Sequence, residues 1–287
     1  MARAIAAGFA QLRSNLEITG LQASTVSTRQ TNVRAAVERR LTVLTSFLSG
    51  SYQRSTMIAP LKSADIDIFV ILDPEYFSKF TPAGLLDKVR TILLETYPET
   101  PKISRNGQAV TITFTDFTVD VVPGFHRRGG GYLIPDSTSG GWLSTDPTVH
   151  DSKLAEANRL HTGDLVPLVK MIKGWNRVIN DAFVGFYLEL MTQNILTGVK
   201  ISDFPSGVRF VFDKGREKIR YKVADPAGYG GHVNPLNGVR TVDDAVSRFS
   251  TACDRAIRAE EFEANGRTDA AFGEWRKIFG DYYPAYG

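Results

Sequence analysis

A chain of 287 residues in which 43% are hydrophobic and 23% are charged has the composition of a globular protein, long enough to fold as one bilobal domain or two smaller ones. Its formal net charge of +3 is too small to indicate a nucleic-acid partner, and no apolar run approaches the ~20 residues that span a membrane. The single cysteine, Cys253, allows no internal disulfide, which predicts a cytoplasmic protein.

The N-terminal segment is predicted to be mainly helical. Residues 1–28 form a helical lead-in that ends in a Ser/Thr-rich loop over 24–28. Over 29–48, apolar residues recur at steps of three and four, which predicts one face of an amphipathic helix. We expect this helix to end where Gly50 arrives, so that Gly50 and Ser51 lie at a helix-to-strand junction.

The next part of the chain is predicted to alternate strands with a helix. The run 65–72 alternates acids with β-branched or aromatic residues, which is the period of a strand. A cap at Thr81 begins a helix that continues to about residue 96. Two strands follow, over 109–114 and 117–122. This order predicts a mixed α/β core whose central strands carry three acids.

The second half is predicted to be mostly helical after a long, glycine-rich loop over 123–147. An irregular section over 199–240 contains the best remaining strand candidate, 208–212. Helices are expected near 163–180, 183–196, 241–263 and 268–279.

The acids of the strand over 65–72 indicate metal chemistry. Asp65 and Asp67 project from the same face, roughly 7 Å apart at the rise of a strand. Two carboxylates this close repel unless a cation or a shared proton neutralises them. The spacing suits two divalent cations, although Asp-x-Asp also occurs by chance on solvated edge strands.

Further residues extend the pattern beyond the two acids. A small residue at Gly50 allows backbone N–H groups to approach phosphate oxygens, and the Ser51 hydroxyl adds a donor. A third acid, Asp120, lies in the strand over 117–122, on the face opposite its apolar neighbours. Gly-Ser, Asp-x-Asp and a later strand Asp form the pattern of the DNA polymerase β-like nucleotidyltransferases, which this sequence resembles.

Longer segments resemble one family within that superfamily. This family comprises the bacterial relatives of cyclic GMP-AMP synthase (CD-NTase, SMODS), the second-messenger synthetases of anti-phage (CBASS) signalling. The resemblance covers nearly the whole chain from about residue 29. It is carried by Gly50–Pro60 continuing to Asp65–Asp67, by Val119–Pro123, by Leu165–Asn176, and by Trp275–Gly280 with Tyr283-Pro284.

The resemblance implies an α+β fold with a polymerase β-like core, in which helices flank a mixed sheet, and a C-terminal helical lobe joined by a long spine helix. We therefore expect residues 1–160 to form the nucleotidyltransferase core lobe with an N-terminal helix, and residues 161–287 to form a mainly helical lobe. The implied reaction joins nucleoside triphosphates stepwise into a cyclic di- or trinucleotide and releases pyrophosphate.

The resemblance also implies the catalytic roles. Asp65, Asp67 and Asp120 are expected to be the catalytic residues, with Asp65 and Asp67 ligating both of two Mg²⁺ ions (Mn²⁺ is an alternative). Asp120 would hold the metal that lowers the pKa of the attacking ribose hydroxyl, and the metals would stabilise the pyrophosphate leaving group. Gly50 and Ser51 are expected to cradle the donor triphosphate.

Further nucleotide contacts are implied for Gln53, Lys170, Lys173, Phe186 and Asp225. The two lysines are expected to meet the outer phosphates, and exposed helix positions are the alternative. Phe186 stands where family members carry a base-stacking tyrosine; ordinary core packing is the alternative, and the glycine before it lacks the serine hydroxyl of that motif. Asp225 is expected to contact a base or to form a plain turn.

The expected partners follow from the same resemblance. They are the nucleoside triphosphate substrates, a downstream effector reached through the product, and a ubiquitin-transfer-like enzyme that conjugates the tail through Gly287. A frayed end is the alternative for the tail. Neither a membrane nor a nucleic acid is expected.

Two other functions compete with the signalling synthase. A polymerase β-like transferase acting on tRNA or another macromolecule would need a strongly basic surface or an RNA-binding appendage, and the net charge of +3 indicates neither. A nucleotide-binding protein with a dead active site typically loses one of the acids, whereas this chain carries all three.

Overall fold

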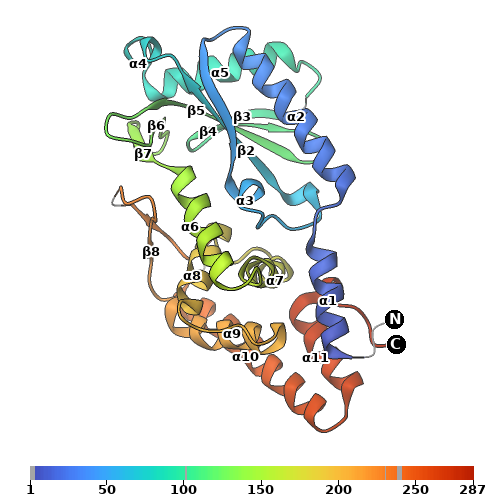
Figure 1. The fold of residues 1–287 in the computed structure, drawn as a ribbon. Helices are drawn as coiled ribbons and strands as arrows, with labels where there is room; N and C mark the ends of the chain where they lie inside the picture. Colours follow the sequence, from blue (N-terminus) through green and yellow to red (C-terminus); the bar gives the residue numbers. More distant parts are fainter. Residues whose placement is uncertain (1–3, 101, 230, 238–240) are drawn as a thin grey trace. The chain divides into compact units, whose positions relative to one another are not determined.

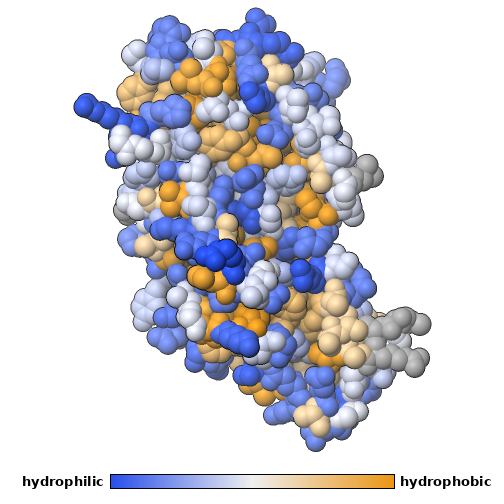
Figure 2. All heavy atoms as spheres, in the orientation of Figure 1, coloured by the Kyte–Doolittle hydropathy of each residue, from blue (hydrophilic) through white to orange (hydrophobic). Residues whose placement is uncertain are grey.

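The computed structural model describes residues 4–100, 102–229, 231–237 and 241–287, and Figure 1 shows its helices and strands. Within these residues, no helix combines the length and the apolar character needed to cross a membrane. On the face shown in Figure 2, hydrophobic residues are interspersed with hydrophilic ones, as is normal for a protein surface.

The chain forms two compact units. The first, which we call the sheet unit, comprises Ile18–Ser152; the second, the helical unit, comprises Met1–Glu17 and Lys153–Gly287. The expected boundary after residue 160 is therefore displaced, and the first helix belongs to the helical unit instead of the core lobe. Its Phe9 explains the assignment, because the ring packs 4.8 Å from that of Trp275.

The sheet unit contains a mixed sheet with helices, as the expected α+β class requires. Its strands run in the order β1-β2-β5-β4-β3, with a β6–β7 hairpin that continues from β5. Only the β2–β5 pair is parallel among these strands. The strands are β1 (Val43–Ser49), β2 (Asp65–Leu72), β3 (Lys102–Asn106), β4 (Ala109–Thr113), β5 (Thr118–His126), β6 (Tyr132–Pro135) and β7 (Trp142–Thr145); the helices are α2 (Gly20–Glu38), α3 (Gly50–Gln53), α4 (Glu75–Lys79) and α5 (Pro82–Thr96), with a 3-10 turn at Leu61–Ser63.

One face of this sheet is covered by helices. Alternate residues of β2, beginning with Ile66, are buried together with apolar side chains of α2 and α5. Burying each such side chain contributes about 1.5–3 kcal/mol, which fixes the register of β2. The intervening residues, beginning with Asp65, therefore lie on the opposite face. We call this the acid face.

The helical unit is built around aromatic side chains. The ring of Trp175 lies 4.9 Å from that of Phe212 and 4.8 Å from that of Phe249. Its elements are α1 (Ile5–Leu16), α7 (Leu165–Val178), α8 (Gly185–Leu196), α9 (Phe204–Lys218), α10 (Val242–Ala264), α11 (Thr268–Phe279), a 3-10 turn at Gly280–Tyr282 and a hairpin of β8 (Val223–Ala224) and β9 (His232–Val233); α6 (Pro147–Leu160) crosses the boundary between the units.

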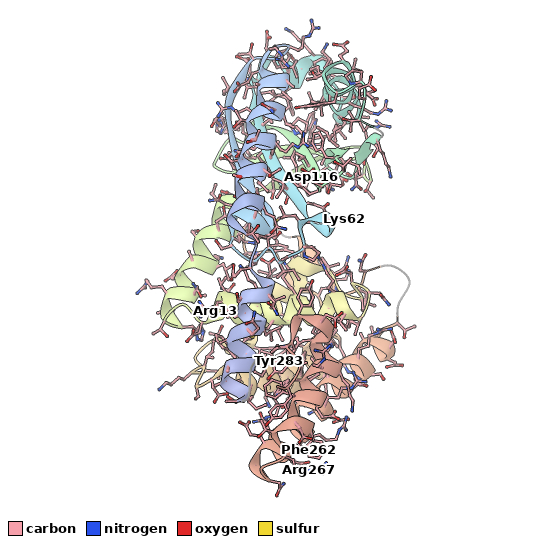
Figure 3. The ribbon with its side chains drawn as sticks, turned by 90° about the vertical axis from the view of Figure 1, so that its right-hand side faces the viewer. Arg13, Lys62, Asp116, Phe262, Arg267 and Tyr283 are labelled. Carbon is pink, nitrogen blue, oxygen red and sulfur yellow. The ribbon has the colours of Figure 1, made fainter. Side chains whose placement is uncertain are left out.

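The end of the chain packs into this unit. Tyr283, labelled in Figure 3, is fully buried and its ring lies 5.4 Å from that of Phe9 in α1. At the turn between α10 and α11, the guanidinium of Arg267 lies 4.6 Å from the ring centroid of Phe262 (Figure 3). The first contact packs the tail against α1, and the second lies within the turn that joins α10 to α11.

The prediction of one helix over 29–48 is wrong in its second half. Helix α2 ends at Glu38, and residues 43–49 form β1, which pairs antiparallel with β2. The leucines at 41, 44 and 48 fit a helical period by coincidence, and cross-strand pairing decides the outcome. Gly50 therefore lies at a strand-to-helix junction.

The predicted loop over 24–28 is also wrong, because these residues lie inside α2. The Thr28 hydroxyl donates to the Ser24 carbonyl oxygen at 3.1 Å, which accommodates a hydroxyl-rich run in a helix. Helices α1 and α2 are separate elements, and Thr19 caps the second of them.

Two further predictions are corrected by the structure. The strand candidate 208–212 lies in α9, where Val208, Val211 and Phe212 are buried at helical spacing. The predicted loop over 123–147 contains the end of β5 and the β6–β7 hairpin. Its glycines serve the turns, since Gly130 has a φ of +101°.

Candidate active site

The two central strands bring the three predicted acids together. In the parallel register of β2 and β5, Asp67 is the direct partner of Asp120, so both side chains leave the same face of the sheet. Asp65 precedes Asp67 by two residues and shares that face. Adjacent strands lie about 5 Å apart, which places all three carboxylates in one small area of the acid face.

Two threonines donate hydrogen bonds to the carboxylates of Asp65 and Asp120, which we call the outer carboxylates. The Thr118 hydroxyl donates a hydrogen bond to Asp65, and the Thr111 hydroxyl of β4 donates one to Asp120. Thr111 is also the direct cross-strand partner of Asp120. The register of the sheet therefore supplies both the acids and the groups that hold them.

The surroundings of Asp120 disfavour its charged form. Burial raises the pKa of the Asp120 carboxyl and the nearby charge of Asp65 raises it further, whereas the hydrogen bond from Thr111 lowers it; the net shift is upward. A cation among these carboxylates would lower the pKa of Asp120 by attracting its charged form. The site is thus suited to bind positive charge.

Gly50 leaves room for the second acid. Its φ is +68°, and a Cβ atom at this position would lie 1.8 Å from the Asp67 carboxylate oxygen. Only glycine combines this backbone conformation with so close an approach. The loop after it is held by Ser51, whose carbonyl oxygen accepts bonds from the Thr56 and Met57 amides at 2.9 and 3.0 Å.

The donor set fits a hard divalent cation, because Mg²⁺ prefers carboxylate oxygens. Among the described residues, no three carboxylate, histidine or cysteine side chains are already gathered closely enough to hold an ion. In this structure Asp65 and Asp120 each accept a hydrogen bond from a threonine hydroxyl, of Thr118 and Thr111 respectively.

The two predicted phosphate-binding lysines are paired with acids of the helical unit. Lys170 is 6% exposed, and its Nζ lies 2.6 Å from Glu17. Lys173 Nζ lies 2.9 Å from Glu189, whose side chain is only 3% exposed. The alternative of exposed helix positions is therefore wrong for Lys170, and both lysines are anchored in ion pairs.

The predicted nucleotide contacts divide between the units. Gln53 lies with the acids in the sheet unit and is exposed, whereas both lysines, Phe186 and Asp225 belong to the helical unit. Phe186 is half-buried in the first turn of α8. Asp225 forms a turn after β8, in which its carboxylate accepts the Ala227 amide at 3.0 Å.

Sequence reasoning missed the threonines and the two glutamates. Thr118 stands two residues before Asp120, so the period of the strand places it on the acid face. Placing Thr111 beside Asp120 requires knowledge of how β4 pairs with β5, which the sequence does not supply. The ion-pair partners of Lys170 and Lys173, which are Glu17 and Glu189, can be identified only from the packing of the helices in the folded chain.

Comparisons with known proteins identify the family to which the chain is similar. Residues 4–158 match the family model described as the Second Messenger Oligonucleotide or Dinucleotide Synthetase domain, abbreviated SMODS. A cyclic AMP-AMP-AMP synthase from Acinetobacter sp. (strain ATCC 27244 / 9458) is 28% identical over 256 residues, which is 83% of this chain and 72% of that protein. A probable cyclic nucleotide synthase from Bacillus cereus (strain VD146) is 26% identical over 275 residues, which is 83% of this chain and 81% of that protein.

Solved structures share the fold. The E. coli MS115-1 CdnC structure with ATP has a TM-score of 0.72 at 18% identity and covers 98% of this chain and 99% of its own. The Vibrio cholerae DncV cyclic AMP-GMP synthase has a TM-score of 0.78 at 13% identity, covering 95% of this chain and 94% of its own. The expected fold is thereby confirmed.

Proposed function

Because the chain belongs to the Second Messenger Oligonucleotide or Dinucleotide Synthetase (SMODS) family, we propose that it joins nucleoside triphosphates into a cyclic di- or trinucleotide and releases pyrophosphate. The observation that carries the proposal is the register of Asp67 beside Asp120, with Asp65 on the same face and Gly50 against Asp67. This arrangement brings Asp67, with the other two acids on its face, beside the turn at Gly50.

The catalytic acids are proposed to hold Mg²⁺, with Mn²⁺ as an alternative. When bound, the metal lowers the pKa of the attacking ribose hydroxyl and neutralises charge on the leaving pyrophosphate. Asp65, Asp67 and Asp120 position the reacting groups, while Thr111 and Thr118 limit how far the outer carboxylates rotate. A bond forms between the ribose oxygen and the α-phosphorus, the bond from that phosphorus to the pyrophosphate oxygen breaks, and the hydroxyl proton passes to solvent water.

The nucleotide contacts that the family resemblance implies are proposed residue by residue. Gly50, Ser51 and Gln53 bind the donor triphosphate through backbone amides and polar side chains. Lys170 and Lys173 meet its outer phosphates when they exchange their carboxylate partners for phosphate oxygens. Phe186 is proposed to stack on a base and Asp225 to contact one.

The biological role is proposed from the relatives. CBASS oligonucleotide cyclases named CdnC from E. coli are 24% identical over 166 residues, and a CBASS role implies a downstream effector that responds to the product. We propose that the protein acts in the cytoplasm, where nucleoside triphosphates are made and a free thiol such as Cys253 stays reduced. Conjugation through Gly287 stays a separate prediction.

A product assay tests the proposal. The purified chain is incubated with radiolabelled ATP, GTP, CTP and UTP and Mg²⁺, then treated with phosphatase. We expect phosphatase-resistant product that is lost in Asp67→Asn and retained in Asp87→Asn, a matched change at an exposed acid of α5. Label transferred to added tRNA, or triphosphate binding without product, would contradict the proposal.

A further inference from the structure

The polar side chains of the acid face continue beyond the acids to the edge of the sheet. Two neighbouring rows of directly paired residues cross this face, and every member from β2 to β3 is polar. The rows are Asp67, Asp120, Thr111 and Ser104, and Asp65, Thr118, Thr113 and Lys102. We call Lys102, Ser104 and Thr113, the members farthest from Asp65 and Asp67, the edge group.

The next row of the same face is apolar, because the β6–β7 hairpin covers it. Phe69 pairs with Val122 there, and both side chains are buried together with Ile134 of β6. By contrast, Lys102 is exposed, and the other two members of the edge group are partly exposed. The edge group therefore lies on the part of the acid face that the hairpin leaves open.

The edge group differs from the threonines nearer the acids in having no partner. Thr111 and Thr118 donate their hydroxyl protons to the outer carboxylates. In the part of the chain that the structure describes, no residue hydrogen-bonds to the hydroxyl of Ser104 or Thr113, and no carboxylate pairs with Lys102. Two hydroxyl donors and one cation, which are groups that bind phosphate oxygens, are thus available to a ligand.

Strand order places the edge group on a defined side of the acids. Gly50 follows β1, which pairs with β2, and the sheet continues in the order β5, β4 and β3. Across the strands, the sequence of features is therefore the glycine-serine turn, the acids and then the edge group. In nucleotidyl transfer the attacking and leaving oxygens lie roughly in line across the phosphorus. Because the donor triphosphate is proposed to lie at the glycine-serine turn, the attacking nucleotide approaches from the side of β4 and β3.

We propose that the edge group binds the 5′ triphosphate of the acceptor nucleotide, the one whose ribose hydroxyl attacks. The inference rests on the proposed function and deepens it, because the acceptor keeps its own triphosphate through the first transfer. Ser104 lies two strands from Asp120, or about 10 Å, a distance that a nucleoside triphosphate spans between its ribose and its outer phosphates. Lys102 supplies a positive charge to those phosphates, and the two hydroxyls donate hydrogen bonds to them.

The alternative role for the edge group is to keep the sheet soluble. Strand β3 is the last strand of the sheet, and a lysine on an edge strand discourages pairing with a second chain. In that role the charge at position 102 would affect neither substrate. A phosphate contact makes the affinity for the acceptor depend on that charge and leaves the affinity for the donor unchanged, so two-substrate kinetics separates the two roles.

The assay uses analogues that can play only one part. A 2′,3′-dideoxynucleoside triphosphate lacks the attacking hydroxyls and serves only as donor, while an α,β-methylene nucleoside triphosphate cannot be cleaved there and serves only as acceptor. Each of the four bases is offered in both forms, and formation of the linear dinucleotide is followed.

The variants change charge and hydroxyl groups separately. Lys102→Arg keeps the charge, Lys102→Gln removes it and Lys102→Glu reverses it, while the double variant Ser104→Ala with Thr113→Val removes both hydroxyls. Lys88→Gln is the matched control, because Lys88 belongs to α5, whose apolar side chains pack on the opposite face of the sheet.

We expect Lys102→Gln and the double variant each to raise the acceptor KM by roughly 10- to 100-fold, the range of hydrogen bonds to charged groups. Lys102→Glu should raise it further, and Lys102→Arg should keep it near the original value. The donor KM should stay unchanged in every variant, and the control should change neither value.

An acceptor KM that does not depend on the charge at position 102, or that the double variant leaves unchanged, would overturn the inference while leaving the proposed function intact. An equal rise in both KM values would overturn it as well. Failure of the unsubstituted chain to form product from unmodified triphosphates would instead refute the proposed function, and the inference with it.

Discussion

Replacement of Gly50 by alanine tests the link between backbone geometry and catalysis. The added Cβ would lie 1.8 Å from the Asp67 carboxylate oxygen. Non-bonded atoms keep roughly 3.4 Å apart, so the carboxylate must withdraw by about 1.5 Å. A misplacement of about 1 Å in a catalytic constellation costs on the order of 100-fold in rate. We expect kcat to fall at least about 100-fold.

The same change has a limited effect on folding. Gly50 has a φ of +68°, and a non-glycine residue in this region costs about 1–2 kcal/mol. Gly107→Ala is the matched control, since its φ is +61° and nothing lies within 4 Å of the added Cβ. Both variants should lose a similar free energy of unfolding in urea, and only Gly50→Ala should lose activity.

The reasoning is refuted by either of two results. Full activity in Gly50→Ala would show that the carboxylate of Asp67 need not stay where the structure places it. Equal losses of activity in Gly50→Ala and Gly107→Ala would show that backbone strain, and not the approach to Asp67, controls the rate.

Three further changes have defined outcomes. Burial alone would raise the pKa of Glu274, but the hydrogen bonds and charges of Lys277 and Arg258 lower it overall, so Glu274→Gln should cost about 1–2 kcal/mol of unfolding free energy at pH 7. A carboxyl whose pKa is lower in the folded than in the unfolded chain stabilises the fold at pH values above the unfolded pKa. The difference in unfolding free energy between the unsubstituted chain and Glu274→Gln should therefore shrink as the pH falls below about 4.5, as measured by urea denaturation. A difference that stays constant with pH would contradict this. Lys173→Met should cost about 3–5 kcal/mol by leaving Glu189 buried without its cation, and Lys173→Met with Glu189→Gln should recover much of that loss; additive losses in urea denaturation would disprove the pairing. Removal of divalent metal with EDTA should abolish synthesis and added Mg²⁺ should restore it in the product assay, whereas persistent synthesis in EDTA would exclude the metal mechanism.

The acid-bearing strands could be predicted from the sequence because acidic and apolar residues alternate along them, which is the two-residue period of a strand. Asp65 and Asp67 alternate with buried residues, and Asp120 stands among apolar neighbours in the same way. Each strand could therefore be assigned a face without knowledge of its partners. That Asp120 lies beside Asp67 depends on parallel pairing, which only the superfamily resemblance indicated in advance.

Two of the wrong predictions concern segments whose apolar residues fit both the spacing of a helix and that of a strand. The leucines at 44 and 48 match a helix, yet the pairing of β1 with β2 makes them strand residues. Val208 and Phe212 match both patterns, and packing within the helical unit selects the helix. The partners of Lys170 and Lys173 were missed because Glu17 is 153 residues from its lysine and Glu189 lies on a different helix.

Anomalous diffraction from crystals of the chain soaked with Mn²⁺ and a non-hydrolysable nucleoside triphosphate tests the central claim most directly. The account predicts metal peaks within coordination distance of Asp65, Asp67 and Asp120, with the triphosphate beside Gly50 and Ser51. Peaks that contact none of the three acids, or a metal site from which Asp120 is excluded, would contradict it.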